Sequence, residues 1–239
     1  MPHAIAYGSS KNGEKGRERL VEESQPKKQS ITLSDRMRVL FKGVLDTVGA
    51  FFNRLGIFPN TMTLIGLAGN IVAAVLLALG HITIGGILVV VMGLVDSIDG
   101  TMARLRGMPT DFGAFVDSVT DRYSELLIFG GLLYYFLAKG EWISGLGVYI
   151  AAGGSVLVSY TRARAAAVGM DTKIGFLSRF ERYLVLAPTL IFNIPVVGIW
   201  IIAVFANFTA LQRIADVRRQ AHEQNKILRK DNQKSPSNK

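Results

Sequence analysis

Long apolar stretches recur along this chain of 239 residues, and they constrain its fold more than any other feature. A helix needs about 20 apolar residues to cross the hydrocarbon core of a bilayer, and several of these stretches reach that length. Six spans are predicted, at about 62–79, 82–104, 110–137, 142–164, 180–192 and 196–214. With 49% hydrophobic residues, the chain is therefore predicted to be an all-α integral membrane protein with six transmembrane helices.

Two polar tails and one amphipathic segment flank the spans. Residues 1–33 are polar and lack apolar periodicity, which predicts a disordered cytoplasmic tail. Over 34–58, apolar side chains recur at helical spacing beside charged ones, which predicts an amphipathic juxtamembrane helix in the membrane interface. Packing of this helix on a soluble partner is the alternative. Residues 59–218 would form one transmembrane domain, and the basic stretch 219–239 a second disordered tail.

Basic side chains give the chain a net charge of +9, and their placement indicates a membrane and not a nucleic acid as the partner. Lys and Arg crowd both ends and the segments 104–106 and 162–182, whereas the loops on the other side contain only Lys139. This positive-inside pattern places both termini in the cytoplasm of a multi-pass protein of the plasma membrane. The lack of cysteine excludes a thiolate nucleophile and Cys-ligated zinc.

Four aspartates stand in or beside the second and third spans, where an ionisable side chain is costly and suggests function. On a helix, Asp96 and Asp99 lie roughly 60° apart, and Asp117 and Asp121 roughly 40° apart, so each pair shares one face. A turn over 106–110, which contains Gly and Pro, would make the helices antiparallel and bring the two faces together. Clustered carboxylates repel one another unless cations bind, which predicts a site for hard divalent ions such as Mg²⁺ or Mn²⁺.

The same acids allow two other interpretations, namely structural charges paired between helices, or a relay in an ion or proton transporter. A transporter is expected to carry acids near mid-bilayer on several helices, whereas here all four lie toward one end of two helices. Gly100 and Gly113 would permit close approach of the helices or of a ligand, and Arg104 could reach a phosphate. The spacing therefore favours an enzyme.

The stretch 96–121 reads D-x2-D-G-x2-A-R-x8-G-x3-D-x3-D, and in this it resembles the signature of the CDP-alcohol phosphotransferases, or CDP-alcohol phosphatidyltransferases. Residues 59–66 are also similar to the Pro-Asn-x-x-Thr-x-x-Gly start of the first span in that family. The resemblance implies a homodimeric enzyme that uses CDP-diacylglycerol and two divalent ions, Mg²⁺ or Mn²⁺, and releases CMP. It assigns the aspartates to metal binding, with the last of them also the general base: Asp96, Asp99, Asp117 and Asp121.

The resemblance further implies a binding site for the CDP portion of the lipid, with residues from the first spans and the turn between the second and third. Its members would be Asn60, Thr61, Met62, Thr63, Gly100, Arg104 and Thr110. Residues 59–218 would then be a CDP-alcohol phosphotransferase domain.

A second group of basic residues follows the fourth span. Ser-Tyr-x-Arg-Ala-Arg-Ala at 159–165, Arg-x-Glu-Arg at 179–182 and Gln-Arg at 212–213 are similar to the phosphatidylinositol-phosphate synthase branch of the family. The similarity implies a phosphorylated polyol, inositol phosphate, as acceptor, with its phosphate held by Arg162, Arg182 and Arg213. The residues alone also fit positive-inside anchors.

Two positions depart from that branch, which has Glu where this chain has Ala166 and Ser178. A phosphatidylglycerol-phosphate or phosphatidylserine synthase, differing only in the acceptor, is therefore the alternative within the family.

Overall fold

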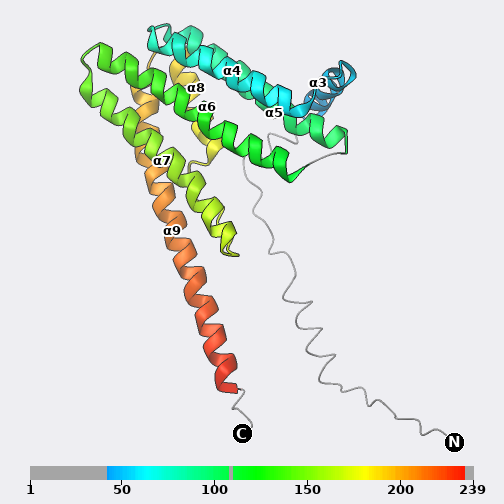
Figure 1. The fold of residues 1–239 in the computed structure, drawn as a ribbon. Helices are drawn as coiled ribbons and strands as arrows, with labels where there is room; N and C mark the ends of the chain where they lie inside the picture. The colour runs from blue at the N-terminus through cyan, green and yellow to red at the C-terminus, as the bar shows by residue number, and fades with distance from the viewer. Residues whose placement is uncertain (1–41, 108–109, 235–239) are drawn as a thin grey trace, which may run out of the picture.

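Seven helices and no strand make up the described part of the chain, which in this computed structural model covers residues 42–107 and 110–234 (Figure 1). The helices are α3 (Lys42–Arg54), α4 (Pro59–Ala78), α5 (Ile82–Leu105), α6 (Asp111–Ala138), α7 (Trp142–Ala167), α8 (Arg179–Ile191) and α9 (Pro195–Lys234). The prediction of an all-helical fold is confirmed for these residues. The predicted tail 1–33, the start of the predicted amphipathic helix (34–41) and residues 235–239 lie outside the described residues.

Four of the six predicted spans are long and apolar enough to cross a membrane, namely α4, α5, α7 and residues Pro195–Lys226 of α9. The other two predicted spans, α6 and α8, do not meet these requirements of length and apolar composition, each for its own reason. Helix α6 has sufficient length but carries several charged side chains in its N-terminal half, and α8 has 13 residues. At 1.5 Å per residue, α8 is roughly 20 Å long, which is shorter than a hydrocarbon core of about 30 Å.

The helices pack in two groups that lie at an angle to each other (Figure 1). Helix α4 packs against both α5 and α6, and α3 packs on α5. Helix α9 packs against α7 and α8, α7 also contacts α6, and α8 also contacts α5. Close approach depends on glycine at some of these contacts, since a Cβ on Gly131 would clash with the carbonyl oxygen of Ala74 on α4. Glycine at this position thus allows α6 and α4 to pack backbone against backbone.

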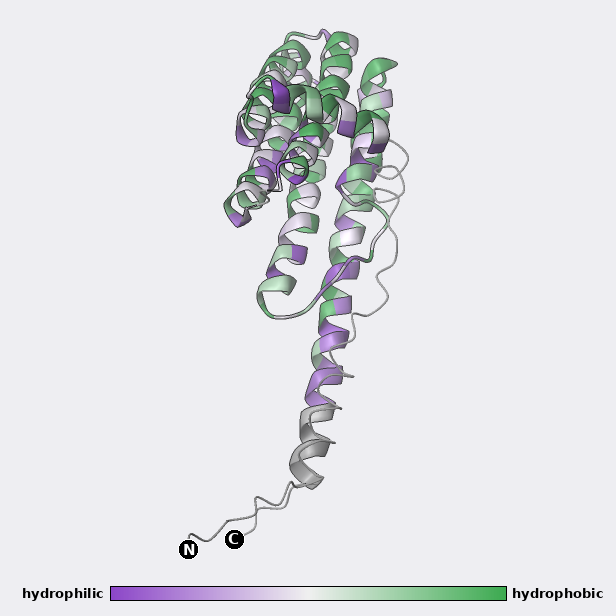
Figure 2. Cartoon of the chain, turned by 90° about the vertical axis from the view of Figure 1, so that its right-hand side faces the viewer, coloured by the Kyte–Doolittle hydropathy of each residue, from purple (hydrophilic) through white to green (hydrophobic). Residues whose placement is uncertain are grey.

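Helix α9 continues to Lys234, in contrast to the predicted disordered tail from 219. Glycine and proline are absent from 199 to 234, so nothing in this stretch breaks the helix. Asp216 accepts hydrogen bonds from Arg219 (2.8 Å) and Gln220 (2.9 Å), three and four residues later, which supports the helix locally. Figure 2 shows α9 changing from hydrophobic to hydrophilic along its length. The change to polar side chains therefore marks the point where α9 leaves apolar surroundings, and the helix itself continues beyond that point.

Candidate active site

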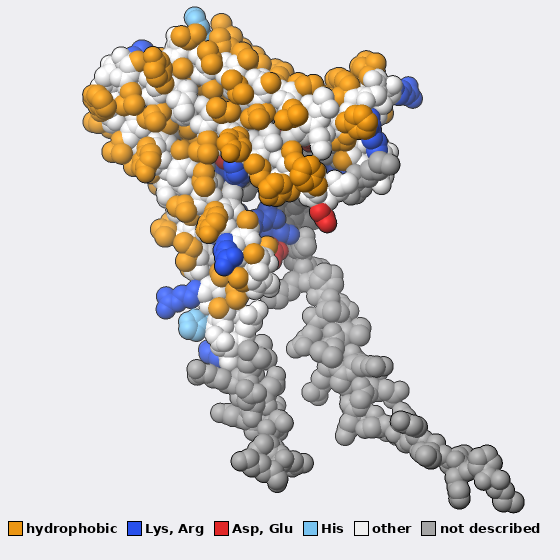
Figure 3. Space-filling view, in the orientation of Figure 1, with side chains coloured by type: hydrophobic (Ala, Val, Ile, Leu, Met, Phe, Trp, Pro, Cys, Tyr) orange, Lys and Arg blue, Asp and Glu red, His pale blue; other side chains and the backbone are white. Residues whose placement is uncertain are grey.

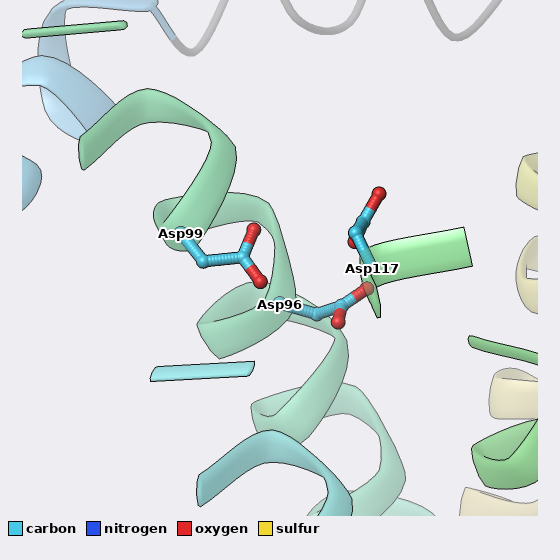
Figure 4. A group of neighbouring side chains, drawn as sticks. All are labelled: Asp96, Asp99 and Asp117. Atoms are coloured by element: carbon cyan, nitrogen blue, oxygen red, sulfur yellow. The ribbon is translucent and has the colours of Figure 1, made fainter. Parts of the chain in front are cut away.

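Helices α5 and α6 bring three of the four predicted aspartates together. The carboxylate oxygens of Asp96, Asp99 and Asp117 lie within 4.8 Å of one another, and Figure 4 shows the side chains converging. Asp99 is buried, and the other two are half-buried. Helical spacing explains the pair on α5, because residues three apart lie on the same face. The cluster therefore forms from two helices, as the periodicity predicts.

The fourth aspartate, Asp121, lies beside this cluster and is linked to it by an arginine. Arg179, the first residue of α8, forms an ion pair with Asp121 Oδ2 and places Nη2 2.8 Å from Asp96 Oδ2. Arg122 lies 3.7 Å from the same Asp121 oxygen. The other oxygen, Asp121 Oδ1, is buried and has no hydrogen-bond partner among the described residues. Asp121 thus has one oxygen held by cations and one available to a ligand.

This set of donors fits a divalent cation. Carboxylate oxygens are hard ligands of the kind that Mg²⁺ and Mn²⁺ prefer. A buried polar atom without a partner, such as Asp121 Oδ1, is rare in folded proteins and calls for an explanation such as an ion. The three-aspartate cluster, with Asp121 beside it, is therefore a candidate metal centre.

The predicted CDP-binding residues of α4 lie at the same end of the molecule. Proline at the first position of the helix, Pro59, fixes its start. Thr63, one turn later, is buried and donates a hydrogen bond from Oγ1 to Asp99 Oδ2 (2.6 Å). Asn60 Oδ1 would lie 3.7 Å from a Cβ placed on Gly113, so α4 also approaches the start of α6. Of the other two, Thr61 is exposed and Met62 is buried.

The remaining predicted CDP-binding residues lie on either side of the α5–α6 turn. Thr110 caps α6, because its Oγ1 accepts a hydrogen bond from the Gly113 backbone N–H (3.0 Å). Arg104 is exposed and donates from Nη2 to Thr101 Oγ1 (2.7 Å). Gly100 is also exposed, on the turn that precedes Arg104. These residues and those of α4 therefore border the aspartates.

The three predicted acceptor arginines approach one another but differ in access. Arg162 is exposed on α7. Arg213 on α9 is buried and donates to the carbonyl oxygens of Ile174 (3.0 Å) and Val158 (2.5 Å). Through its bond to Val158, Arg213 contacts α7 one helical turn before Arg162. Figure 3 shows Lys and Arg side chains gathered on the lower part of this face, below a mainly hydrophobic body.

Arg182 is the most enclosed of the three, with 2% of its surface exposed. It forms a bidentate pair with Glu125 of α6, from Nε to Oε1 (2.7 Å) and from Nη2 to Oε2 (3.0 Å). Its Nη1 donates to the Leu177 carbonyl oxygen (3.3 Å). All three nitrogens of its guanidinium therefore have partners within the protein.

Arg179 and Glu125 are the site residues that the sequence interpretation missed. Arg179 and Arg182 are three residues apart on α8, and their partners Asp121 and Glu125 are four apart on α6. Each spacing places its two residues on one face of a helix. Two arginines on one helix and two acids on another, at matching intervals, could therefore have been recognised in the sequence as possible ion pairs. Two ion pairs, one turn apart, thus join α6 to α8.

Comparisons with known proteins agree on one family. The family model described as CDP-alcohol phosphatidyltransferase matches residues 56–211. A phosphatidylinositol phosphate synthase of Streptomyces avermitilis is 33% identical over 207 residues, covering 80% of this chain and 84% of that protein. An archaetidylinositol phosphate synthase of Pyrococcus horikoshii is 31% identical over 186 residues, covering 77% and 96%.

Solved structures give the same result. The crystal structure of Mycobacterium tuberculosis phosphatidylinositol phosphate synthase with CDP-DAG bound matches with a TM-score of 0.69 and 29% identity, covering 73% of this chain and 93% of that one. The same enzyme in complex with manganese and citrate also has a TM-score of 0.69, at 29% identity and coverages of 72% and 88%. The matched region contains the four aspartates, Arg162, Arg179 and Arg182, and it covers α4 to α8 and the first part of α9; α3 and Arg213 lie outside it. The chain belongs to the CDP-alcohol phosphatidyltransferase family.

Proposed function

We propose that the protein transfers the phosphatidyl group of CDP-diacylglycerol to a hydroxyl of inositol phosphate, forming phosphatidylinositol phosphate and releasing CMP. The observation that carries this proposal is the aspartate cluster, which lies beside the proposed CDP-binding residues of α4 and α5. The similar enzymes named as phosphatidylinositol phosphate synthases, one of which binds CDP-DAG, support the choice of both substrates.

In this proposal, Asp96, Asp99, Asp117 and Asp121 would hold two divalent ions, Mg²⁺ or Mn²⁺. When bound, such ions neutralise the charge of the pyrophosphate and polarise its phosphorus. Phosphoryl transfer otherwise requires mainly positioning, because little covalent chemistry falls to the protein. The new bond joins the acceptor oxygen to the phosphorus of the phosphatidyl group, and the bond from that phosphorus to CMP breaks.

Side chains of the protein would position the reacting groups for this transfer. Asp121 would accept the proton of the acceptor hydroxyl, and Arg179 would hold its Oδ2 so that Oδ1 faces the reacting groups. Thr63 fixes the Asp99 carboxylate by donating to Oδ2. Asn60, together with Thr61, Met62, Gly100, Arg104 and Thr110, would bind the CDP portion.

The acceptor phosphate would be held by Arg162, Arg182 and Arg213. Guanidinium groups suit this task because they are always charged and donate in pairs to phosphate oxygens. Arg162, which is exposed, is the direct ligand in this proposal, and Arg213, which has no carboxylate partner among its hydrogen bonds to described residues, adds positive charge close by. A glycerol phosphate or serine acceptor would make the protein another synthase of the same family.

Release of CMP from CDP-diacylglycerol by the purified protein tests the function and the acceptor together. With Mg²⁺ present, we expect inositol phosphate to support turnover and glycerol 3-phosphate and serine to support little. Arg162→Gln should raise the apparent KM for inositol phosphate by about ten- to a hundredfold, the value of one charge-assisted contact of roughly 1.5 to 3 kcal/mol. The apparent KM for CDP-diacylglycerol should change little.

Arg164→Gln is the matched control, because Arg164 is also exposed on α7 and lies two residues away, on another face of the helix. Turnover with glycerol 3-phosphate alone would overturn the inositol phosphate assignment and leave the transferase assignment in place. No CMP release with any acceptor would overturn both.

We also propose that all six predicted spans cross the plasma membrane, with the 13-residue α8 doing so only together with the residues that flank it, and that both termini and the site face the cytoplasm. The positive-inside pattern supports this orientation. The family resemblance supports a homodimer, which the mass of the purified particle would test.

Single cysteines can test the orientation directly, because the natural chain has none. A cysteine replacing the exposed Glu141, between α6 and α7, should react with an impermeant thiol reagent added to intact cells. One replacing the exposed Val168, after α7, should react only once the cells are opened. The reverse labelling would invert the proposed topology.

A further inference from the structure

Arg106, the residue that caps α5, connects this helix to α3 and to the turn before α4. It donates from Nε to Asn53 Oδ1 (2.7 Å) and from Nη2 to the Ile57 carbonyl oxygen (2.6 Å). Its guanidinium carbon also lies 5.0 Å from the centre of the Phe58 ring. Asn53 in turn donates from Nδ2 to the Met102 carbonyl oxygen (3.1 Å). Hydrogen bonds of Arg106 and Asn53 therefore connect the last turn of α5 to the end of α3.

A small apolar cluster joins the same elements, separate from the main core of the protein. Its buried members are Met62 of α4 and Ile98 and Met102 of α5. Partly buried residues of α3, of the following turn and of α5 pack against them: Leu45, Val48, Phe52, Ile57 and Val95. Because Met62 lies between Asn60 and Thr63, the proposed CDP-binding segment of α4 rests on this cluster.

Helix α3 also packs on α5 next to two residues of the proposed CDP site, Gly100 and Arg104. A Cβ on Gly49 would be 3.2 Å from Thr101 Cγ2, which leaves no room for a larger side chain without movement. Thr101 accepts the hydrogen bond from Arg104 (2.7 Å). The position of α3 therefore bears on Arg104 as well as on the α4 segment.

We propose that Arg106 is a positioning residue for the CDP-lipid site. It holds α3 against α5, and α3 in turn supports the residues that form the site. By fixing α3 and the turn before α4 against α5, Arg106 sets the spacing between Asn60 and Thr63 on one side and Gly100 and Arg104 on the other. The inference rests on the proposed function of this site. It gives α3, which is predicted to lie in the membrane interface, a part in substrate binding as well.

The expected effect is on binding of the CDP-lipid and not on the chemical step. Among the described residues, the side-chain hydrogen bonds of Arg106 go to α3 and the following turn, and not to the aspartates. A site that is preorganised loses affinity when its two halves are free to separate. An interaction lost equally from the ground and transition states raises KM and leaves kcat unchanged.

Arg106→Gln in the full-length enzyme should raise the apparent KM for CDP-diacylglycerol about tenfold, a change typical of losing charge-assisted hydrogen bonds. The kcat value and the KM for inositol phosphate should stay within about twofold. Arg106→Lys should recover only part of the loss, because an ammonium group cannot reproduce the fork that reaches Asn53 and Ile57 together. Arg54→Gln is the control, as it removes the same charge from an exposed position at the end of α3.

Asn53→Ala removes the same connection from the α3 side and should raise the same KM. The double variant Arg106→Gln/Asn53→Ala should be no worse than the more severe single variant, since two residues of one unit are not additive. A second readout is thermal stabilisation by CDP with Mg²⁺ present, which should need about tenfold more CDP in either variant.

An unchanged KM for CDP-diacylglycerol in Asn53→Ala would overturn the inference, even if Arg106→Gln failed to fold. So would a fall in kcat and in melting temperature without a change in KM, because that pattern reports a purely structural role. In either case a wild-type enzyme that releases CMP normally would leave the proposed function intact. A wild-type enzyme without activity would instead remove the proposed function on which the inference rests.

Discussion

Changing Asp117 to asparagine is expected to abolish CMP release, with a loss on the order of 10³-fold or more, comparable to removing a charge-stabilising group in other phosphoryl transfers. Asparagine keeps the shape of the side chain but removes the negative charge that would hold a divalent ion. Because Asp117 faces Asp96 and Asp99, the variant should fold at least as well as the wild type, since repulsion within the cluster is reduced. Asp96→Asn should behave in the same way.

Three measurements separate this loss from general damage. Mn²⁺ binding, followed by electron paramagnetic resonance, should weaken in Asp117→Asn, while the melting temperature in detergent should not fall. Chelation by EDTA should inactivate the wild type, and added Mg²⁺ or Mn²⁺ should restore it. Asp111→Asn is the control, because this carboxylate lies in the first turn of the same helix and is exposed. Undiminished activity after complete chelation would rule out the metal centre.

The second large effect concerns the buried pair between α6 and α8. Glu125→Gln would leave the Arg182 guanidinium, which is 2% exposed, without its counter-charge. Removing one partner of a buried pair costs about 3 to 5 kcal/mol, much more than the net value of the pair itself. The variant should therefore unfold at a markedly lower temperature or denaturant concentration in the same detergent.

A double replacement tests the cause of that loss. Glu125→Leu/Arg182→Met removes both charges and should recover most of the stability, because apolar side chains of similar volume can replace a buried ion pair at little cost. Arg219→Gln provides the comparison, since this arginine is 71% exposed in its pair with Asp216 and should contribute no more than about 1 kcal/mol. Equal stability of Glu125→Gln and the wild type would contradict a structural role for the pair.

The double variant also shows whether Arg182 binds the acceptor. In the single variant Arg182→Gln, a rise in KM for inositol phosphate would be mixed with the effects of an uncompensated Glu125. In Glu125→Leu/Arg182→Met neither charge remains, so no buried carboxylate is left without a partner. A raised KM for inositol phosphate in a stable double variant would assign a binding role to Arg182, and an unchanged KM would leave Arg162 and Arg213 as the candidates.

The aspartate cluster was predictable because its geometry follows from helical periodicity within two segments. Asp96 and Asp99 share a face at any position of α5, and Asp117 needs only the antiparallel turn to meet them. Helix limits were predictable for a similar reason, since proline starts α4 at Pro59 and glycine with a positive φ of 64° follows α5 at Gly107.

The pairing of Arg179 with Asp121 was not predictable in the same way. The spacing of these charges indicates which helix faces could pair, but whether they meet depends on how α8 is rotated and placed against α6, which packing among several helices decides. The burial of Arg182 depends on the same placement. The helical state of 219–234 was missed because a polar composition is equally compatible with a solvated helix and with a disordered tail.

The 40 residues of α9 give the molecule a rigid spacer. At 1.5 Å per residue the helix is roughly 60 Å long, about twice the thickness of a hydrocarbon core. If its apolar half crosses the bilayer, the far end stands on the order of 30 Å from the edge of the hydrocarbon core. A tag or tether fused behind this helix would therefore be held well away from the lipid headgroups, on the side of the membrane where the active site is proposed to lie.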